Sequence, residues 1–222
     1  MPYPVLLTVL FIELFSFVIF NVVSRVFYKK RHRVKYHFYN MFPYELNYPA
    51  VFKENPYGNF LFIFSCFAII VFYILNPYSS IYRVVTLIIA ITLAMVLLCM
   101  LMMPLNYLRT HLSLSCVAMA LSLALPLFNL FLALSQFNIH TSQIRDVLCL
   151  VSMVFSGILA LAMIILILNP KLTFRIYMDK VIDRHGNEVL KRPSVIFLAL
   201  TEWVSIFIYF LSPISIVLIS LF

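Results

Sequence analysis

The chain has 222 residues, of which 64% are apolar and only 11% are charged, with a formal net charge of +8. Soluble domains carry about 25% charged residues, so this composition excludes a water-soluble fold and makes the lipid bilayer the solvent for most side chains. We therefore predict an all-α integral membrane protein, in which residues 1–222 form a single polytopic membrane domain.

Six apolar segments can each cross a bilayer as a helix, which takes about 20 residues. Two connections, at 76–80 and 105–113, are short enough to force the flanking helices into antiparallel hairpins. We expect a bundle of about six transmembrane helices. In chain order, the predicted spans are residues 4–24, 59–75, 82–105, 112–135, 147–168 and 195–221.

The first span contains an acidic residue, Glu13. A charged side chain inside a span costs at least about 2.5–3.5 kcal/mol and usually faces the helix bundle or water. With a rise of 1.5 Å per residue, Glu13 lies about 18 Å above Arg25, near the middle of the membrane. Thr8 and Ser16 flank it by about one helical turn on either side and are its candidate hydrogen-bond partners.

The loop at 25–58 begins with a basic cluster and continues with many aromatic residues. Basic residues beside a span attract anionic lipid headgroups by about 1 kcal/mol per charge. A nucleic-acid partner is disfavoured, because the cluster adjoins the membrane and no nucleic-acid-binding motif accompanies it. Disordered linkers are poor in aromatic residues, so we expect the rest of this loop to lie on the cytoplasmic face, or alternatively to cover a central cavity. The basic cluster comprises Lys29, Lys30, Arg31, Arg33 and Lys35.

Sulfur-containing residues recur at helical spacing in the third and fourth spans. An antiparallel hairpin would bring Cys99, Met103, Cys116 and Met119 to matching depths. Thiolate and thioether groups are ligands that select Cu(I), yet Cys and Met are also ordinary apolar side chains in protein cores. We interpret them as packing residues, keep a copper site as a weak alternative, and predict no cofactor.

The loop at 169–194 predicts a β-hairpin near 181–190. Val181-Ile182 and Val189-Leu190 flank a turn candidate that contains Gly186 and Asn187, two residue types that tolerate positive φ. Because an isolated hairpin is marginally stable in water, we expect it to pack on the aromatic loop. Together the two loops would form a small cytoplasmic loop platform.

The last span contains the second acidic residue, Glu202, next to the only tryptophan, Trp203. Glu202 lies roughly 12 Å above Ser194 and about 6 Å from the depth of Glu13. Tryptophan is typical of the membrane interface, and Ser205 and Tyr209 are candidate hydrogen-bond partners for the acid. We favour interhelical hydrogen bonds, worth about 1 kcal/mol, as the role of both glutamates; a proton- or cation-responsive site is the alternative.

Loop charges predict the orientation of the chain in the membrane. All but two of the 16 Lys and Arg residues lie in the loops at 25–58 and 169–194 and in the link at 105–113; the exceptions are Arg83 and Arg145. We predict that these three segments are cytoplasmic. Both termini are then on the non-cytoplasmic side, and we expect the membrane to be the cell membrane.

No catalytic motif occurs: the chain has no GxSxG, HExxH or P-loop sequence. The chain is therefore interpreted as a non-catalytic integral membrane subunit or scaffold. It would bind anionic lipid, or a membrane or cytoplasmic protein, through its basic aromatic loops. The first alternative is a small proton- or cation-linked transporter or channel that uses Glu13 and Glu202, and the second is an intramembrane enzyme that uses polar groups on the cytoplasmic side.

Overall fold

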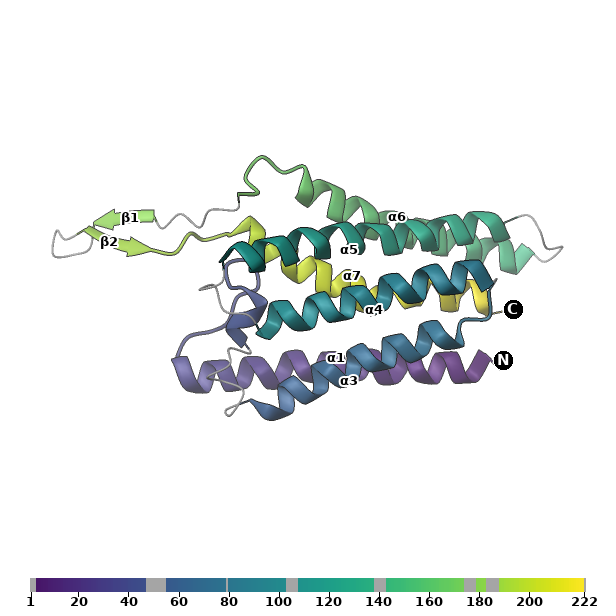
Figure 1. Cartoon of the computed structure of the whole chain (residues 1–222), viewed down its shortest axis with the longest axis horizontal. Coiled ribbons are helices and arrows are strands. Elements are labelled where there is room, and N and C mark those ends of the chain that lie inside the picture. The colour runs from purple at the N-terminus through teal and green to yellow at the C-terminus, as the bar shows by residue number, and fades with distance from the viewer. Residues whose placement is uncertain are drawn as a thin grey trace.

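The computed structural model is a bundle of six long helices, each apolar enough to span a membrane (Figure 1). It describes residues 3–46, 55–78, 80–102, 108–137, 143–173, 179–182 and 188–221. The predicted all-α bundle of six spans is confirmed. The helices are α1 (Tyr3–His32), α3 (Pro56–Leu75), α4 (Ser80–Met102), α5 (Leu108–Gln136), α6 (Gln143–Ile167) and α7 (Phe197–Ser220).

Helix α7 is the central element of the bundle. It packs against α1, α3, α5 and α6, and most of its side chains are buried. Side chains of neighbouring helices donate hydrogen bonds to its main chain: Asn129 Nδ2 to the carbonyl of Ser212 at 2.9 Å, and Ser152 Oγ to that of Ser215 at 2.9 Å. Such interhelical bonds contribute about 0.6–1 kcal/mol each.

The start of α3 is fixed to α1 by Asn55. Its Oδ1 accepts a hydrogen bond from the amide of Gly58 at 3.0 Å, which caps the helix. Its Nδ2 donates to Ser24 Oγ of α1 at 3.0 Å. A Cβ on Gly58 would collide with both Asn55 and Ser24, so this close approach of the two helices requires glycine.

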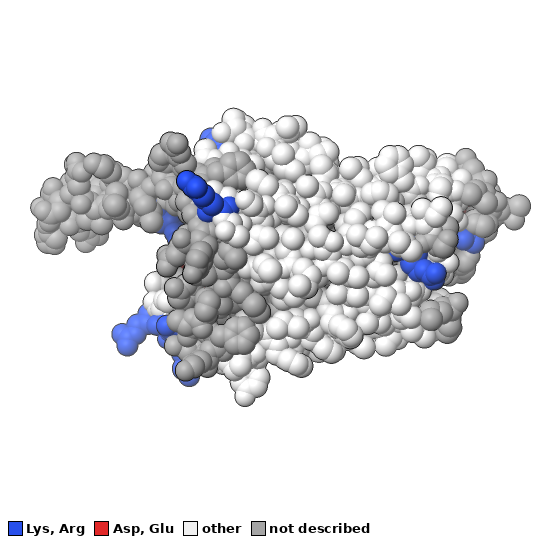
Figure 2. All heavy atoms as spheres, in the orientation of Figure 1, with Lys and Arg blue, Asp and Glu red and all other residues white. Residues whose placement is uncertain are grey.

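The outer surface of the bundle is apolar along its middle. Figure 2 shows one face, on which Lys and Arg lie near the two ends and the described residues between them are uncharged. Helices α1 and α6 expose the longest rows of large apolar side chains. These include Phe11, Phe15, Val18, Val22 and Val26 on α1, and Val147, Val151, Val154, Ile158 and Ile165 on α6.

A β-hairpin precedes α7. Strands β1 (Asp179–Ile182) and β2 (Glu188–Lys191) pair antiparallel, with Val181 opposite Val189. The hairpin predicted near 181–190 is therefore present, while its turn residues lie outside the described residues. Contrary to expectation, the hairpin projects away from the bundle (Figure 1), because the residues that follow β2 make the contacts with the other loop instead.

Both termini lie at the end of the bundle opposite the hairpin (Figure 1). The end with the hairpin also carries the last turn of α1, which contains Lys29, Lys30, Arg31 and His32. We call it the basic end. Helix α1 continues to His32, two turns past the predicted end of the first span at residue 24, so part of the predicted loop is helical.

Candidate functional site

A pocket of about 380 Å³ lies at the basic end, between the last turns of α1 and the short 3-10 helix η1 (Pro43–Leu46). The exposed side chains of Lys30 and Arg31 give it positive charge. The C-terminus of a helix also favours basic side chains. The pocket is lined by Phe27, Tyr28, Lys30, Arg31, His32, Glu45 and Leu46.

The one described acid of the pocket, Glu45, is paired with Arg192. Arg192 Nη1 donates to Glu45 Oε2 at 2.9 Å, and Glu45 Oε1 accepts from the amide of Phe42 at 3.0 Å. Burial by itself lowers the pKa of Arg192, but the hydrogen bond and charge of Glu45 outweigh it and raise this pKa. The carboxylate of Glu45 is therefore already neutralised by Arg192.

The loop after α1 is fixed to α7 by Trp203. Trp203 Nε1 donates to Tyr36 Oη at 2.8 Å and to the carbonyl of Met41 at 3.1 Å, and Tyr36 Oη donates to the carbonyl of Phe42 at 2.8 Å. Burial raises the pKa of Tyr36 well above its usual value, so its hydroxyl stays protonated. Trp203 is fully buried and is therefore not the interfacial side chain that the sequence suggested.

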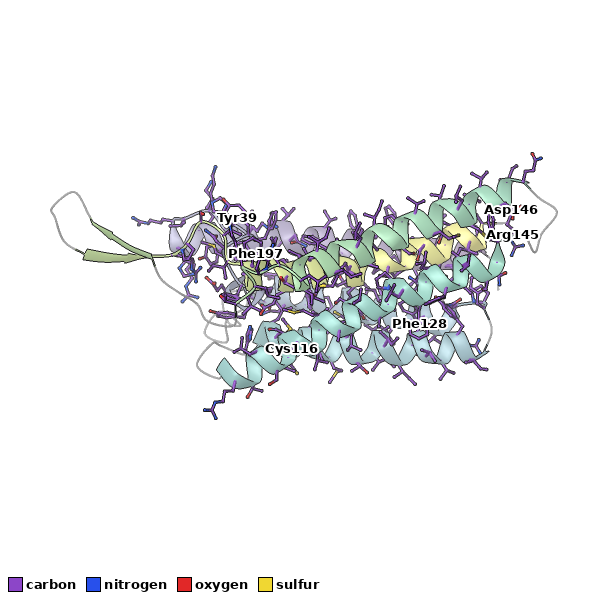
Figure 3. All side chains as sticks on the ribbon, turned by 90° about the horizontal axis from the view of Figure 1, so that it is seen from above. Tyr39, Cys116, Phe128, Arg145, Asp146 and Phe197 are labelled. Atoms are coloured by element: carbon purple, nitrogen blue, oxygen red, sulfur yellow. The ribbon has the colours of Figure 1, made fainter. Side chains whose placement is uncertain are left out.

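A main-chain contact joins the two loops at the same end. The amide of Ile196, just before α7, donates to the carbonyl of Tyr39 at 2.8 Å. Figure 3 shows Tyr39 and the first residue of α7, Phe197, close together at this end, with Arg145 and Asp146 at the other. The two loops thus form one platform through residues 36–46 and 192–196, without the hairpin.

Glu202 joins α5 to α7 beneath this platform. Its Oε1 lies 2.9 Å from His111 Nε2 and accepts a hydrogen bond from Ser115 Oγ at 2.7 Å. All three side chains are buried. The rings of Phe42 and Tyr44 pack edge-on against His111, with centroid distances of 6.1 and 5.6 Å.

These three residues do not form a catalytic triad. In a triad the histidine accepts the serine proton, whereas here the Ser115 hydroxyl donates to Glu202 and to the carbonyl of His111. Of the two residues predicted to pair with Glu202, Ser205 donates to the carbonyl of Thr201, and the Tyr209 hydroxyl has no hydrogen-bond partner among the described residues. His111 and Ser115 were missed as partners although they lie one turn apart at the start of the fourth span, at the depth of Glu202.

Glu13 is also completely buried, but neither of its carboxylate oxygens has a hydrogen-bond partner among the described residues. Its two predicted partners bond within their own helix: Thr8 donates to the carbonyl of Pro4 and Ser16 to that of Ile12. The groups that interact with the charge of Glu13 come from α3 and α7 instead. They are Cys66, Tyr73 and Tyr209.

The sulfur-containing residues lie in different surroundings. Cys99 and Cys116 are exposed on the surface of the bundle, whereas Met119 is buried in a cluster with Phe42 and Leu159. Met103 lies outside the described residues. The copper hypothesis therefore has no described cluster of sulfur atoms to support it.

The remaining members of the predicted basic cluster stay near the platform. Lys29, Arg33 and Lys35 are exposed, and Arg33 has a φ of 55°, the left-handed conformation that ends α1.

Comparison of the chain with known protein families, curated proteins and solved structures gives no significant match.

Proposed function

We propose that this protein is a non-catalytic integral membrane subunit or scaffold whose basic end binds anionic lipid headgroups. The observation that supports this proposal is the pocket between α1 and η1, which combines Lys30 and Arg31 with a volume of about 380 Å³. Arginine and lysine are the side chains that bind phosphate groups, by paired hydrogen bonds and by charge. Glu45 does not oppose such a ligand, because it is neutralised by Arg192.

The surface of α1 beside the pocket suits the rest of a lipid molecule. Val22, Val26 and Lys30 follow one another at intervals of four residues, which places them on one face of the helix. Val22 and Val26 are more than half exposed. An acyl chain lying along the two valines would bring its phosphate to Lys30 and the pocket.

Removing the charges of the pocket tests this proposal. We expect the double variant K30Q/R31Q to bind phosphatidylglycerol about 30-fold more weakly, because each lost charge near a membrane surface is worth about 1 kcal/mol. Native mass spectrometry of the protein in mild detergent, with phosphatidylglycerol or phosphatidylcholine added, measures the bound lipid.

The matched control is R33Q/K35Q, which removes the same charge from residues that are not among the described lining of the pocket. It should reduce phosphatidylglycerol binding less than K30Q/R31Q does. Equal losses in both variants, or equal binding of the two lipids by the unmodified protein, would contradict a headgroup site in this pocket.

We also propose that the basic end faces the cytoplasm of a cell membrane, where it could contact a membrane or cytoplasmic protein. The distribution of Lys and Arg supports this orientation. Cysteine residues introduced at Lys35 and at Arg83 would test it in intact cells. A membrane-impermeant thiol reagent should label the cysteine at position 83 and leave that at position 35 unlabelled.

The alternative function, a transporter path that contains both glutamates, has less support. Glu202 is engaged with His111 and Ser115, and neither glutamate lines a described pocket. The apolar pocket on the N-terminal half of α1 is lined by Leu7, Thr8, Leu10, Phe11 and Leu14. Of the two glutamates, only Glu13 has no hydrogen-bond partner among the described residues that would explain its burial.

A further inference from the structure

Three buried polar side chains without hydrogen bonds meet between α1, α3 and α7. Glu13, Tyr73 and Tyr209 each have no solvent exposure. Both oxygens of Glu13 and both tyrosine hydroxyls have no hydrogen-bond partner among the described residues. Tyr73, Tyr209 and the thiol of Cys66 belong to one buried cluster, and α1, which carries Glu13, packs against both of their helices. The charge of Glu13 lies within electrostatic range of all three groups.

The neighbouring helices do not complete this cluster. From α5, Asn129 is close enough to the Tyr73 hydroxyl to interact with it without a hydrogen bond of normal geometry. The Asn129 side chain is already engaged, because it accepts a hydrogen bond from Tyr82 at 2.6 Å and donates one to the carbonyl of Ser212. No described Lys, Arg or His interacts with the charge of Glu13. The only charge within the cluster is therefore the carboxylate.

An isolated carboxylate in an apolar interior is costly, and so are buried polar groups without hydrogen bonds. A bound cation removes both costs, because it neutralises the acid and orders the tyrosine hydroxyls around itself. Carboxylate and hydroxyl oxygens are ligands that suit a proton or a small hard cation. A divalent ion would keep a net positive charge, since the cluster contains one acid.

We propose that Glu13, Tyr73 and Tyr209 form an internal binding site for a small monovalent cation, either a proton or an alkali-metal ion. Glu13 supplies the negative charge, and the two phenol oxygens supply neutral ligands. This site is separate from the proposed lipid pocket and does not depend on it. The variant K30Q/R31Q should therefore bind the cation normally.

Thermal unfolding of the full chain in detergent measures the binding. Once the free concentration of the ion exceeds its Kd, we expect the melting temperature to rise by about 3–5 °C for each further tenfold increase of that concentration. A pH series in alkali-free buffer detects a proton. A series of sodium, potassium or lithium chloride against choline chloride, at constant ionic strength and mildly alkaline pH, detects an alkali-metal ion.

The variant Glu13→Gln tests whether Glu13 is the site. Glutamine is neutral and similar in shape to glutamate, so the dependence of the melting temperature on the cation should disappear. Glu202→Gln is the control for the second buried acid and should retain the dependence. Infrared difference spectra of the unmodified protein and Glu13→Gln distinguish the two ions: a protonated-acid carbonyl band indicates a proton, and a carboxylate band that shifts with the alkali ion indicates the metal.

Tyr73→Phe and Tyr209→Phe keep the test valid if Glu13→Gln does not fold. Each removes one oxygen and should weaken cation binding about three- to tenfold, whereas Tyr57→Phe, at an exposed position on α3, should not. A carboxylate band of Glu13 that is insensitive to alkali ions would overturn the proposal. So would the same pH and salt dependence in the unmodified protein and in Glu13→Gln.

Discussion

The two glutamates inside the bundle have opposite surroundings. Glu202 shares one oxygen between His111 and Ser115 of α5, whereas Glu13 has no hydrogen-bond partner among the described residues. Both are buried to the same degree. Burial alone therefore does not tell whether an acid within a membrane protein is structural: the side chains around it decide this.

The difference follows from the helices that surround each acid. Around Glu202, α5 presents a small serine and a histidine one turn apart, and both can donate hydrogen bonds. One turn after Glu13, the helix carries Phe17, which stacks on Phe210 of α7 at a centroid distance of 4.0 Å. Phe62 of α3 packs against the same Phe210 at 5.7 Å. These rings fill space and cannot hydrogen-bond a carboxylate.

The largest effect should come from breaking the pair between α5 and α7. We expect His111→Ala to destabilise the protein by about 3 kcal/mol, because it leaves a cavity and deprives the buried carboxyl group of Glu202 of one of its two hydrogen-bond partners. Fluorescence of Trp203, the only tryptophan, reports the unfolding. The control is Thr110→Ala at the exposed neighbouring position, and a similar small loss in both variants would show that the pair is unimportant.

Removing the hydroxyl that joins the platform to α7 should have the next largest effect. We expect Tyr36→Phe to cost about 2 kcal/mol, because it removes the hydroxyl that accepts a hydrogen bond from Trp203 Nε1 and donates one to the carbonyl of Phe42. Tyr39→Phe, at an exposed position in the same loop, is the control. An equal cost for the two variants would contradict the contact.

The same variant should change the alkaline stability of the protein. Burial raises the pKa of Tyr36, so above about pH 10, where tyrosine ionises in an unfolded chain, the folded state binds more protons than the unfolded state. Stability therefore decreases as the pH rises through this range. Unfolding of Tyr36→Phe should show a smaller decrease than that of the unmodified protein or Tyr39→Phe.

A smaller effect should follow from removing the second donor to Glu202. We expect Ser115→Ala to cost about 1.5 kcal/mol, the value for a hydrogen bond to a charged group. Ser113→Ala is the matched control, because the Ser113 hydroxyl is exposed and donates only to its own helix, at the carbonyl of Arg109. Denaturant unfolding of both variants under one set of conditions provides the comparison.

The helices were predictable from the sequence, and the partners of the two acids were not. Lengths of apolar segments predicted the six spans, and Gly186 with Asn187 indicated the hairpin. In a bilayer, however, the outside of the bundle is as apolar as its inside, so the sequence does not indicate which face of a helix is buried. His111, close behind Arg109, is therefore not predicted as a partner of Glu202, and Trp203 is predicted at the membrane interface, although both are buried against other helices.

The smallest effect should be that of Glu13→Gln at a cation concentration well below the Kd, where the ion adds no stability to the unmodified protein. The amide keeps the shape of the side chain and no hydrogen bond of the described protein is lost, so we expect a change of less than about 0.5 kcal/mol. Glu202→Gln should cost more, because the amide replaces a charged acceptor of two hydrogen bonds. Equal stability losses for the two variants would mean that Glu13 has structural partners like those of Glu202. A near-neutral Glu13→Gln with an intact Glu202 pair would mean that the two acids have different roles, one joining helices and the other binding a ligand.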